Sequence, residues 1–273
     1  MTGKTLRLKR LFTRGRSVIV PMDHAIYFGP VPALRDPAGW VADVAGTEAD
    51  ALLMTLGCLN RVAPVVGNQG VIARIDGTVT RLGPSLEVTD QIASVEQAVS
   101  AGADAVVLNV YVGVDSEREM LGKLGRAAEA CQRWGMPLVA EMIPGAALAR
   151  HYAVGAPQAE REVLAEQVAV AARVGAEMGA DVIKTCYTGS ADTFAFVVEN
   201  ATVPVWAAGG PVATGAGGVI QMVDEVMRSG AAGVCIGRNV WERAERLVLL
   251  QTICRMVHHQ LSAAEAQESL AER

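Results

Sequence analysis

A short pattern that recurs along the chain constrains its fold more than any other feature. Glycine or an acidic residue precedes Ala-Asp or Ala-Ala, and a burst of apolar residues follows, as in 48–54, 102–108, 179–185 and 230–236. This pattern is typical of a helix that ends on glycine, turns tightly and continues into a buried parallel strand. The pattern therefore predicts an alternation of helices and buried parallel strands.

Apolar bursts predict eight strands, and most of the stretches between them have helical periodicity. The strands are expected near residues 17–22, 51–55, 70–75, 105–110, 137–142, 181–185, 203–207 and 232–236. Eight strand–helix units in about 250 residues are typical of a (β/α)8, or TIM, barrel. An open doubly wound sheet would carry a glycine-rich fingerprint after its first strand, whereas Val20-Pro-Met-Asp-His24 stands there.

We therefore predict an α/β protein that folds as a single-domain TIM barrel over residues 1–273. No linker or low-complexity tract divides the chain. Residues 1–16 carry six positive charges and no negative ones, at Lys4, Arg7, Lys9, Arg10, Arg14 and Arg16. Such a segment is either a polyanion-binding arm or a solvated cap under the barrel or a subunit contact, and we favour the cap because short charge runs are commonly solvated. Residues 261–273 are a polar, alanine-rich tail.

Composition excludes several classes of protein. The net charge of −5 argues against nonspecific nucleic-acid binding, and no apolar run approaches the ~18 residues of a membrane span. Residues 1–17 are basic without a hydrophobic segment, so no signal peptide is expected. The five cysteines are widely spaced without CxxC, and the four histidines form no HxH or HxxxH cluster. We expect a cytoplasmic protein with no metal, no cofactor, no nucleic-acid partner and no membrane partner.

Polar residues at the C-terminal ends of the predicted strands are the candidates for chemistry, because TIM-barrel active sites lie there. The most informative is Lys184, which lies inside the apolar burst 181–185 on the same strand face as Val182 and Cys186. If that face points into the barrel, desolvation should lower the pKa of Lys184 and supply the free amine that attacks a carbonyl to form a Schiff base. The alternatives are a lysine paired with a core carboxylate, or one that points outward between helices.

Two further strand ends suggest ligand contacts. Gly209 and Gly210 follow the seventh predicted strand, and Gly237 and Arg238 follow the eighth, where this fold usually binds phosphate. Ordinary turn chemistry would also explain the glycines, but their presence at both strands favours a phosphate site. Asp23 and His24 end the first strand and are candidates for acid–base chemistry or for holding the lysine and substrate, although an aspartate there is also a common cap.

At these strand ends the chain resembles the archaeal-type (DhnA-type) class I aldolases, which include fructose-bisphosphate aldolases and 2-amino-3,7-dideoxy-D-threo-hept-6-ulosonate synthases. The resemblance rests on Val20-Pro-Met-Asp-His24, Ile183-Lys-Thr-Cys-Tyr-Thr-Gly189, Ala208-Gly-Gly-Pro211 and Gly233-Val-Cys-Ile-Gly-Arg-Asn239. It implies that Lys184 forms the Schiff base and that Asp23 is a catalytic carboxylate. It also implies that Gly209, Gly210, Gly237 and Arg238 hold a substrate phosphate, that no cofactor is needed, and that copies form a homo-oligomer, a decamer in many relatives.

The chain departs from this family after the fifth predicted strand. Many members carry Tyr-Pro-Arg-Gly there, with the tyrosine as proton donor or acceptor, whereas this chain has Ile143-Pro-Gly145-Ala. Either another group moves the proton, with Tyr187, Tyr111, His24 and Glu141 as candidates, or the reaction differs.

The leading hypothesis is a class I aldolase or transaldolase-like enzyme that makes or breaks a C–C bond of a small phosphorylated ketose. Fructose 1,6-bisphosphate, dihydroxyacetone phosphate and a deoxy-ketohexose phosphate are examples of such a substrate. The first alternative is a thiolase-like acyl transferase that acts on a phosphorylated dicarbonyl with coenzyme A, since a related branch lacks the tyrosine. The second is a barrel that binds a phosphometabolite without turnover.

Overall fold

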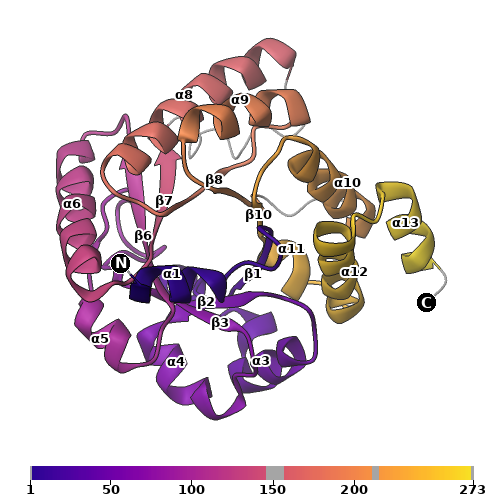
Figure 1. Cartoon of the computed structure of the whole chain (residues 1–273), viewed down its shortest axis with the longest axis horizontal. Helices are drawn as coiled ribbons and strands as arrows, with labels where there is room; N and C mark the ends of the chain where they lie inside the picture. The colour runs from indigo at the N-terminus through magenta and orange to yellow at the C-terminus, as the bar shows by residue number, and fades with distance from the viewer. Residues whose placement is uncertain (1, 146–156, 211–214, 272–273) are drawn as a thin grey trace.

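The computed structural model describes residues 2–145, 157–210 and 215–271, and eight parallel strands in it form a closed barrel surrounded by helices (Figure 1). The barrel order is β1-β10-β9-β8-β7-β6-β3-β2, so the sheet closes where β1 pairs with both β2 and β10. All eight predicted strands are confirmed. Their bounds are β1 (Ser17–Pro21), β2 (Ala51–Thr55), β3 (Gly70–Arg74), β6 (Ala105–Val112), β7 (Leu138–Pro144), β8 (Val182–Cys186), β9 (Val205–Ala208) and β10 (Gly233–Cys235).

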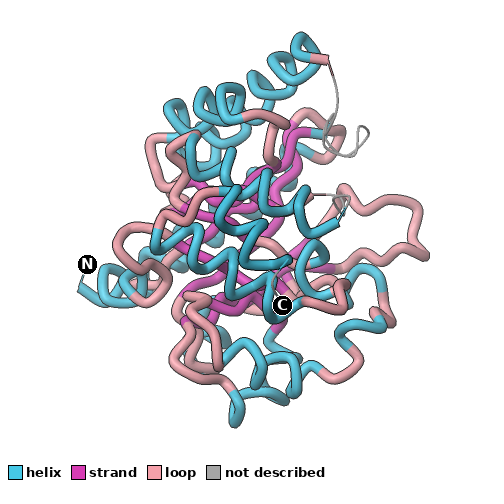
Figure 2. The backbone as a smooth tube through the Cα atoms, turned by 90° about the vertical axis from the view of Figure 1, so that its right-hand side faces the viewer, coloured by secondary structure: helices cyan, strands magenta, loops and turns pink. Residues whose placement is uncertain are grey.

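Helices cover the outside of the barrel and give the layered arrangement of Figure 2. They are α1 (Thr2–Lys9), α2 (Ala25–Phe28), α3 (Pro37–Ala45), α4 (Leu56–Val62), α5 (Val95–Ser100), α6 (Glu117–Trp134), α8 (Gln158–Glu177), α9 (Ala191–Ala201), α10 (Gly215–Arg228), α11 (Arg238–Trp241), α12 (Arg246–His259) and α13 (Ala263–Ala271). Two 3₁₀ turns (Pro32–Leu34 and Ala63–Val65) and a hairpin of β4 (Asp76–Gly77) with β5 (Asp90–Gln91) complete the described elements. None of the helices in these ranges combines the length and hydrophobicity needed to cross a membrane.

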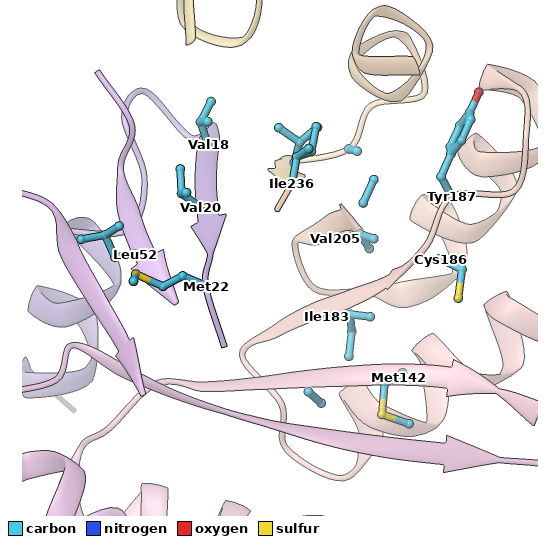
Figure 3. Packing of buried hydrophobic residues seen from close by; sticks show 14 of the residues in the cluster. Val18, Val20, Met22, Leu52, Met142, Ile183, Cys186, Tyr187, Val205 and Ile236 are labelled. Atoms are coloured by element: carbon cyan, nitrogen blue, oxygen red, sulfur yellow. The ribbon is translucent and has the colours of Figure 1, made fainter. Parts of the chain in front are cut away.

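Two buried layers hold the barrel together. Side chains that point outward from the strands pack against the helices, and part of this layer is drawn in Figure 3. A second cluster fills the barrel interior, with Ile19, Ala51, Leu53, Ile72, Ala105, Val107, Val139, Val182, Trp206 and Cys235 contributed by the eight strands. This interior is a packed core rather than a channel, as is typical of the fold.

The basic N-terminal segment contacts the end of the barrel at which the strands begin. Helix α1 lies across this end (Figure 1), and Leu11 and Phe12 pack against the interior cluster. Lys4 pairs with Asp181 at 2.9 Å, and Arg10 lies 3.3 Å from Asp104. These contacts direct the segment's hydrophobic side chains inward, away from the end of the barrel where the candidate chemistry lies.

Candidate active site

The C-terminal ends of the strands surround a cavity of about 590 Å³. Charged side chains from several strands line it: Asp23 and His24 after β1, Arg74 of β3, Glu141 of β7 and Lys184 of β8. The volume lies within the range of about 300–1,000 Å³ that small-molecule sites occupy. The candidate site therefore lies at the expected end of the barrel.

Lys184 points into the barrel and lies two residues after Val182, a member of the interior cluster, toward the C-terminal end of β8. Strand β7 places Glu141 directly beside it in the parallel register, and Lys184 Nζ lies 2.7 Å from Glu141 Oε1. Burial acts to lower the pKa of Lys184, but Cys235, Glu141 and Asp23 outweigh it and raise the pKa above its usual value. Because burial raises the pKa of the Cys235 thiol to about 12, that thiol is uncharged at neutral pH, and the two carboxylates stabilise the ammonium.

The expectation that desolvation lowers the pKa of Lys184 is therefore wrong, because the neighbouring charges raise it. An ion pair with a core carboxylate, one of the alternatives that the sequence left open, is present. The expectation that this strand face points into the barrel agrees with the geometry, since Lys184 is 5% exposed and lines the cavity. Lys184 is thus a charged amine at rest, with a proton acceptor in contact.

Arg74 is the centre of a buried charge network at the floor of the cavity. Its Nε donates to Asp23 Oδ2, its Nη1 to Asp76 Oδ1 at 2.9 Å, and its Nη2 to Glu141 Oε2 at 2.5 Å. The guanidinium side chain is 2% exposed, and its planar fork of donors suits several carboxylates at once. One cation therefore orients both carboxylates that flank Lys184.

This network controls the charge of the two carboxylates. Burial acts to raise the pKa of Asp23, but Arg74 above all, with His24 and Lys184, holds that pKa far below its usual range. Burial likewise opposes ionisation of Glu141, and Lys184 and Arg74 together lower its pKa below the usual value. Both groups are therefore carboxylates at neutral pH.

A second buried lysine connects the network to the β4–β5 hairpin. Lys123 of α6 lies 2.9 Å from Asp76 Oδ2 and donates to the hydroxyl oxygen of Thr89 at 2.6 Å. Between Asp76 and Thr89 the chain runs along the cavity, where Ser85, Leu86 and Glu87 form part of the wall. The same aspartate thus orients Arg74 and fixes the start of this wall segment.

A small adjoining cavity of about 70 Å³ brings the glycine-bearing loops together. Gly209, Gly210, Gly237 and Arg238 line it together with Lys184. Gly210 has a φ of +62°, and a Cβ atom built at Gly237 would come within 3.0 Å of the Pro21 carbonyl oxygen. Turn geometry and close packing therefore also favour glycine here. The glycines alone do not distinguish a phosphate site from ordinary turn chemistry. Pro211 lies outside the described residues.

The four candidates for moving a proton fall into two groups. His24, Tyr111 and Glu141 line the main cavity with Lys184. Tyr187 packs in the outer hydrophobic layer (Figure 3), and its hydroxyl donates to Glu225 of α10. Tyr187 therefore lies apart from the cavity.

Sequence patterns missed Arg74, Asp76 and Lys123 as parts of the site. The signal for Arg74 was the same as for Lys184, a charged residue inside the apolar burst 70–75. Lys123 falls among Met120, Leu124 and Ala127 on the buried face of α6. Trp134, at the end of the same helix, is instead 44% exposed and donates its indole N–H to Glu96.

Comparison with known proteins identifies relatives over nearly the whole chain. The model of the DeoC/LacD family aldolases matches residues 17–243. A 2-amino-3,7-dideoxy-D-threo-hept-6-ulosonate synthase of Halobacterium salinarum is 37% identical over 256 residues, covering 94% of this chain and 92% of the relative. A 2-amino-4,5-dihydroxy-6-oxo-7-(phosphonooxy)heptanoate synthase of Streptomyces griseus is 30% identical, with 94% and 91% coverage. A solved Schiff-base-forming fructose-1,6-bisphosphate aldolase superposes with a TM-score of 0.81 at 31% identity, covering 93% of this chain and 99% of that one.

The lowered pKa values predict that stability falls in acid. A carboxyl group whose pKa is lower in the folded than in the unfolded chain stabilises the fold above its unfolded value of about 4, and this contribution is lost as pH falls toward its folded pKa. The free energy of unfolding, measured by urea denaturation, should therefore decrease as pH falls below about 4. Replacing Glu141 by Gln should make this decrease shallower, whereas Glu129→Gln, at an exposed pair, should leave the slope unchanged. An equal slope in wild type and Glu141→Gln would contradict the interpretation.

Replacing Arg74 by Met should destabilise the fold strongly, because Asp23, Asp76 and Glu141 would remain buried without their shared cation. Breaking a buried ion pair by removing one partner costs about 3–5 kcal/mol. Urea denaturation near pH 7 measures the loss. Arg133→Met is the control, since its pair with Glu129 on α6 is exposed and should contribute less than about 1 kcal/mol. Losses of similar size in the two variants would show that the network is not a major source of stability.

Proposed function

The chain belongs to the DeoC/LacD family of aldolases and is a class I, Schiff-base aldolase; we propose that Lys184 is its nucleophile and that its substrate is a small phosphorylated ketose. The observation that carries this proposal is an inward-pointing lysine, 5% exposed, in contact with a carboxylate beside a cavity of about 590 Å³. The acyl-transferase and non-catalytic interpretations lack such support, since the three proteins compared above are two synthases and an aldolase.

Glu141 activates Lys184 in this proposal. When the ketone enters, the ammonium passes a proton to the carboxylate 2.7 Å away, and the free amine attacks the carbonyl carbon. A proton then moves from the attacking nitrogen to the former carbonyl oxygen, which gives the neutral carbinolamine. The protonated Glu141 then gives its proton to the carbinolamine hydroxyl, which leaves as water and produces the iminium. Glu141 is a carboxylate again and can accept a proton from the adjacent carbon as the enamine forms.

Asp23 and His24 support the same intermediate. Because Asp23 is held as a carboxylate by Arg74, it is suited to stabilise the positive charge of the iminium and thereby to assist dehydration of the carbinolamine. His24 Nδ1 lies 3.4 Å from Asp23 Oδ1, and the His24 ring packs edge-on against Trp241. Its place in both cavities is suited to contact with the substrate between the lysine and the phosphate.

The substrate phosphate would occupy the small cavity beside Lys184. Arg238 lines this cavity, and Gly209, Gly210 and Gly237 allow backbone N–H groups to approach an anion. Two of the compared proteins are named for phosphorylated compounds, a (phosphonooxy)heptanoate and fructose 1,6-bisphosphate. A ketose phosphate with its carbonyl at Lys184 and its phosphate at Arg238 fits both the chemistry and the arrangement of the two cavities.

We also propose that the enzyme is a cytoplasmic homo-oligomer, with a decamer as the expected form. All five cysteines are buried and none is joined in a disulfide, which fits a reducing compartment. Val163 and Val170 of α8 and Phe196 of α9 are 46%, 58% and 44% exposed, and apolar side chains on an outer face favour association between copies. No metal or cofactor enters the proposed chemistry.

Borohydride reduction in the presence of dihydroxyacetone phosphate should leave a mass adduct on Lys184. The iminium that the proposal requires is reduced to a stable secondary amine, which peptide mapping by mass spectrometry locates. Lys123 is an internal control, because it is also buried but is held by Asp76 and Thr89 away from the main cavity. Lys184→Met should abolish both the adduct and the aldol activity. An adduct at another lysine, or none in the wild type, would exclude the proposed role of Lys184.

Replacing Arg238 by Gln should raise KM for phosphorylated substrates by roughly 10–100-fold, because a hydrogen bond to a charged group contributes about 1.5–3 kcal/mol. Steady-state kinetics with dihydroxyacetone phosphate and with dihydroxyacetone should show that the preference for the phosphorylated form is lost. Arg228→Gln, in an exposed pair with Asp224 on α10, is the control and should leave both KM values unchanged. An unchanged preference in Arg238→Gln would place the phosphate elsewhere.

A further inference from the structure

The upper layer of the cavity contains a tyrosine at a position that the mechanism above does not use. Strands β6 and β7 pair in register, so that Asn109 lies opposite Glu141 and Tyr111 lies opposite Ile143. Residues two apart on a strand share a face and are separated by about 6.6 Å. Tyr111 therefore lies one layer above the level of Glu141 and Lys184, nearer the mouth of the cavity.

The hydroxyl of Tyr111 is available for a ligand. Of the tyrosines in the described residues, Tyr27 accepts a hydrogen bond from Asn109 Nδ2 at 2.9 Å, and Tyr187 donates to Glu225. The Tyr111 hydroxyl has no hydrogen-bond partner within the described part of the chain, although its ring is 5% exposed and lines the cavity. A buried ring that carries an unpartnered hydroxyl into a ligand cavity is suited to contact with the ligand.

The order of strands gives the direction in which a bound ketose extends. Lys184 stands on β8, with β9 and β10 on one side and β7 and β6 on the other. If the phosphate binds beside Gly209 and Arg238, which follow β9 and β10, the rest of the carbon chain extends from Lys184 toward β7 and β6. The oxygen on the far side of the reacting C–C bond then lies on the Tyr111 side of the cavity.

We propose that Tyr111 is the catalytic acid–base group at the carbon–carbon bond, where it exchanges a proton with the oxygen of the aldehyde half. In condensation the enamine electron pair forms the C–C bond, the aldehyde π pair moves to its oxygen, and that oxygen takes the phenolic proton of Tyr111. The proton that Glu141 accepted when the enamine formed then returns to the phenolate, so no proton is gained or lost in a turnover. Cleavage is the reverse. This inference rests on the proposed function of Lys184.

The charge state of Tyr111 agrees with this role. Burial, and after it the charge of Glu141, raises the pKa of Tyr111 above its usual value, so that the hydroxyl keeps its proton at neutral pH. The neighbouring position on β7 holds Ile143, which cannot exchange a proton. Tyr111 thus supplies a hydroxyl group in the layer where the adjacent strand has none.

The test separates enamine formation from the bond-forming step. Tyr111→Phe should lower kcat for condensation of dihydroxyacetone phosphate with D-glyceraldehyde 3-phosphate by about 100-fold or more, the usual range for loss of an acid–base group. The variant should keep the borohydride adduct on Lys184 and the exchange of the enamine-forming C–H of dihydroxyacetone phosphate with D₂O, followed by NMR. Tyr187→Phe is the matched control, because it also removes a tyrosine hydroxyl, but one that lies outside the cavity. It should keep the condensation rate, the adduct and the C–H exchange of the wild type.

A second variant tests the position of the hydroxyl. Adding Ile143→Tyr to Tyr111→Phe places a hydroxyl on the adjacent strand, opposite the one that was lost. The double variant should condense the substrates at least tenfold faster than Tyr111→Phe. Retention of more than about a tenth of kcat in Tyr111→Phe would overturn the proposal, and so would loss of C–H exchange or of the adduct, or a double variant without recovery. Absence of adduct and exchange in the wild type would instead refute the role of Lys184.

Discussion

The buried guanidinium of Arg74 is the interaction on which the rest of the site depends. It contacts Asp23 from the segment after β1, Asp76 at the start of the hairpin, and Glu141 on β7. Three carboxylates at the floor of an apolar barrel would repel one another and would favour protonation without a cation between them. With Arg74 in place, two of them remain charged beside Lys184 and set its protonation.

This arrangement explains how a lysine with a raised pKa serves as a nucleophile. A lysine desolvated in an apolar pocket would be a free amine at rest, and so would need no acceptor. In this protein the ammonium is stabilised, and the carboxylate that stabilises it is also the acceptor for its proton. Because Arg74 binds the other oxygen of Glu141, the carboxylate is held in the orientation that the transfer requires. Electrostatic stabilisation and proton transfer are thus functions of one contact.

The same charges connect the site to its cover. Asp76 contacts both Arg74 and Lys123, and Lys123 also contacts Thr89 at the far end of the segment that lines the cavity. A change in the charge of the cavity floor therefore alters the contacts of Asp76 and Thr89, which are the two ends of that segment. The segment that contains Ser85, Leu86 and Glu87 is thus held at both ends, by Asp76 and Thr89, to the charged floor of the cavity.

Local sequence determined the eight strands and their alternation with helices, because hydrophobic periodicity and glycine-terminated helices act over a few residues at a time. It also indicated Lys184, Asp23, His24 and the glycine-bearing loops, since a barrel gathers its strand ends at one face. Only the tertiary structure decided the charge of Lys184, because Glu141 and Arg74 come from other strands, and pairing between strands depends on register rather than on local pattern. The same holds for Tyr111 and Tyr187: the sequence offered both as candidates, and the directions of their side chains placed one in the cavity and the other against α10.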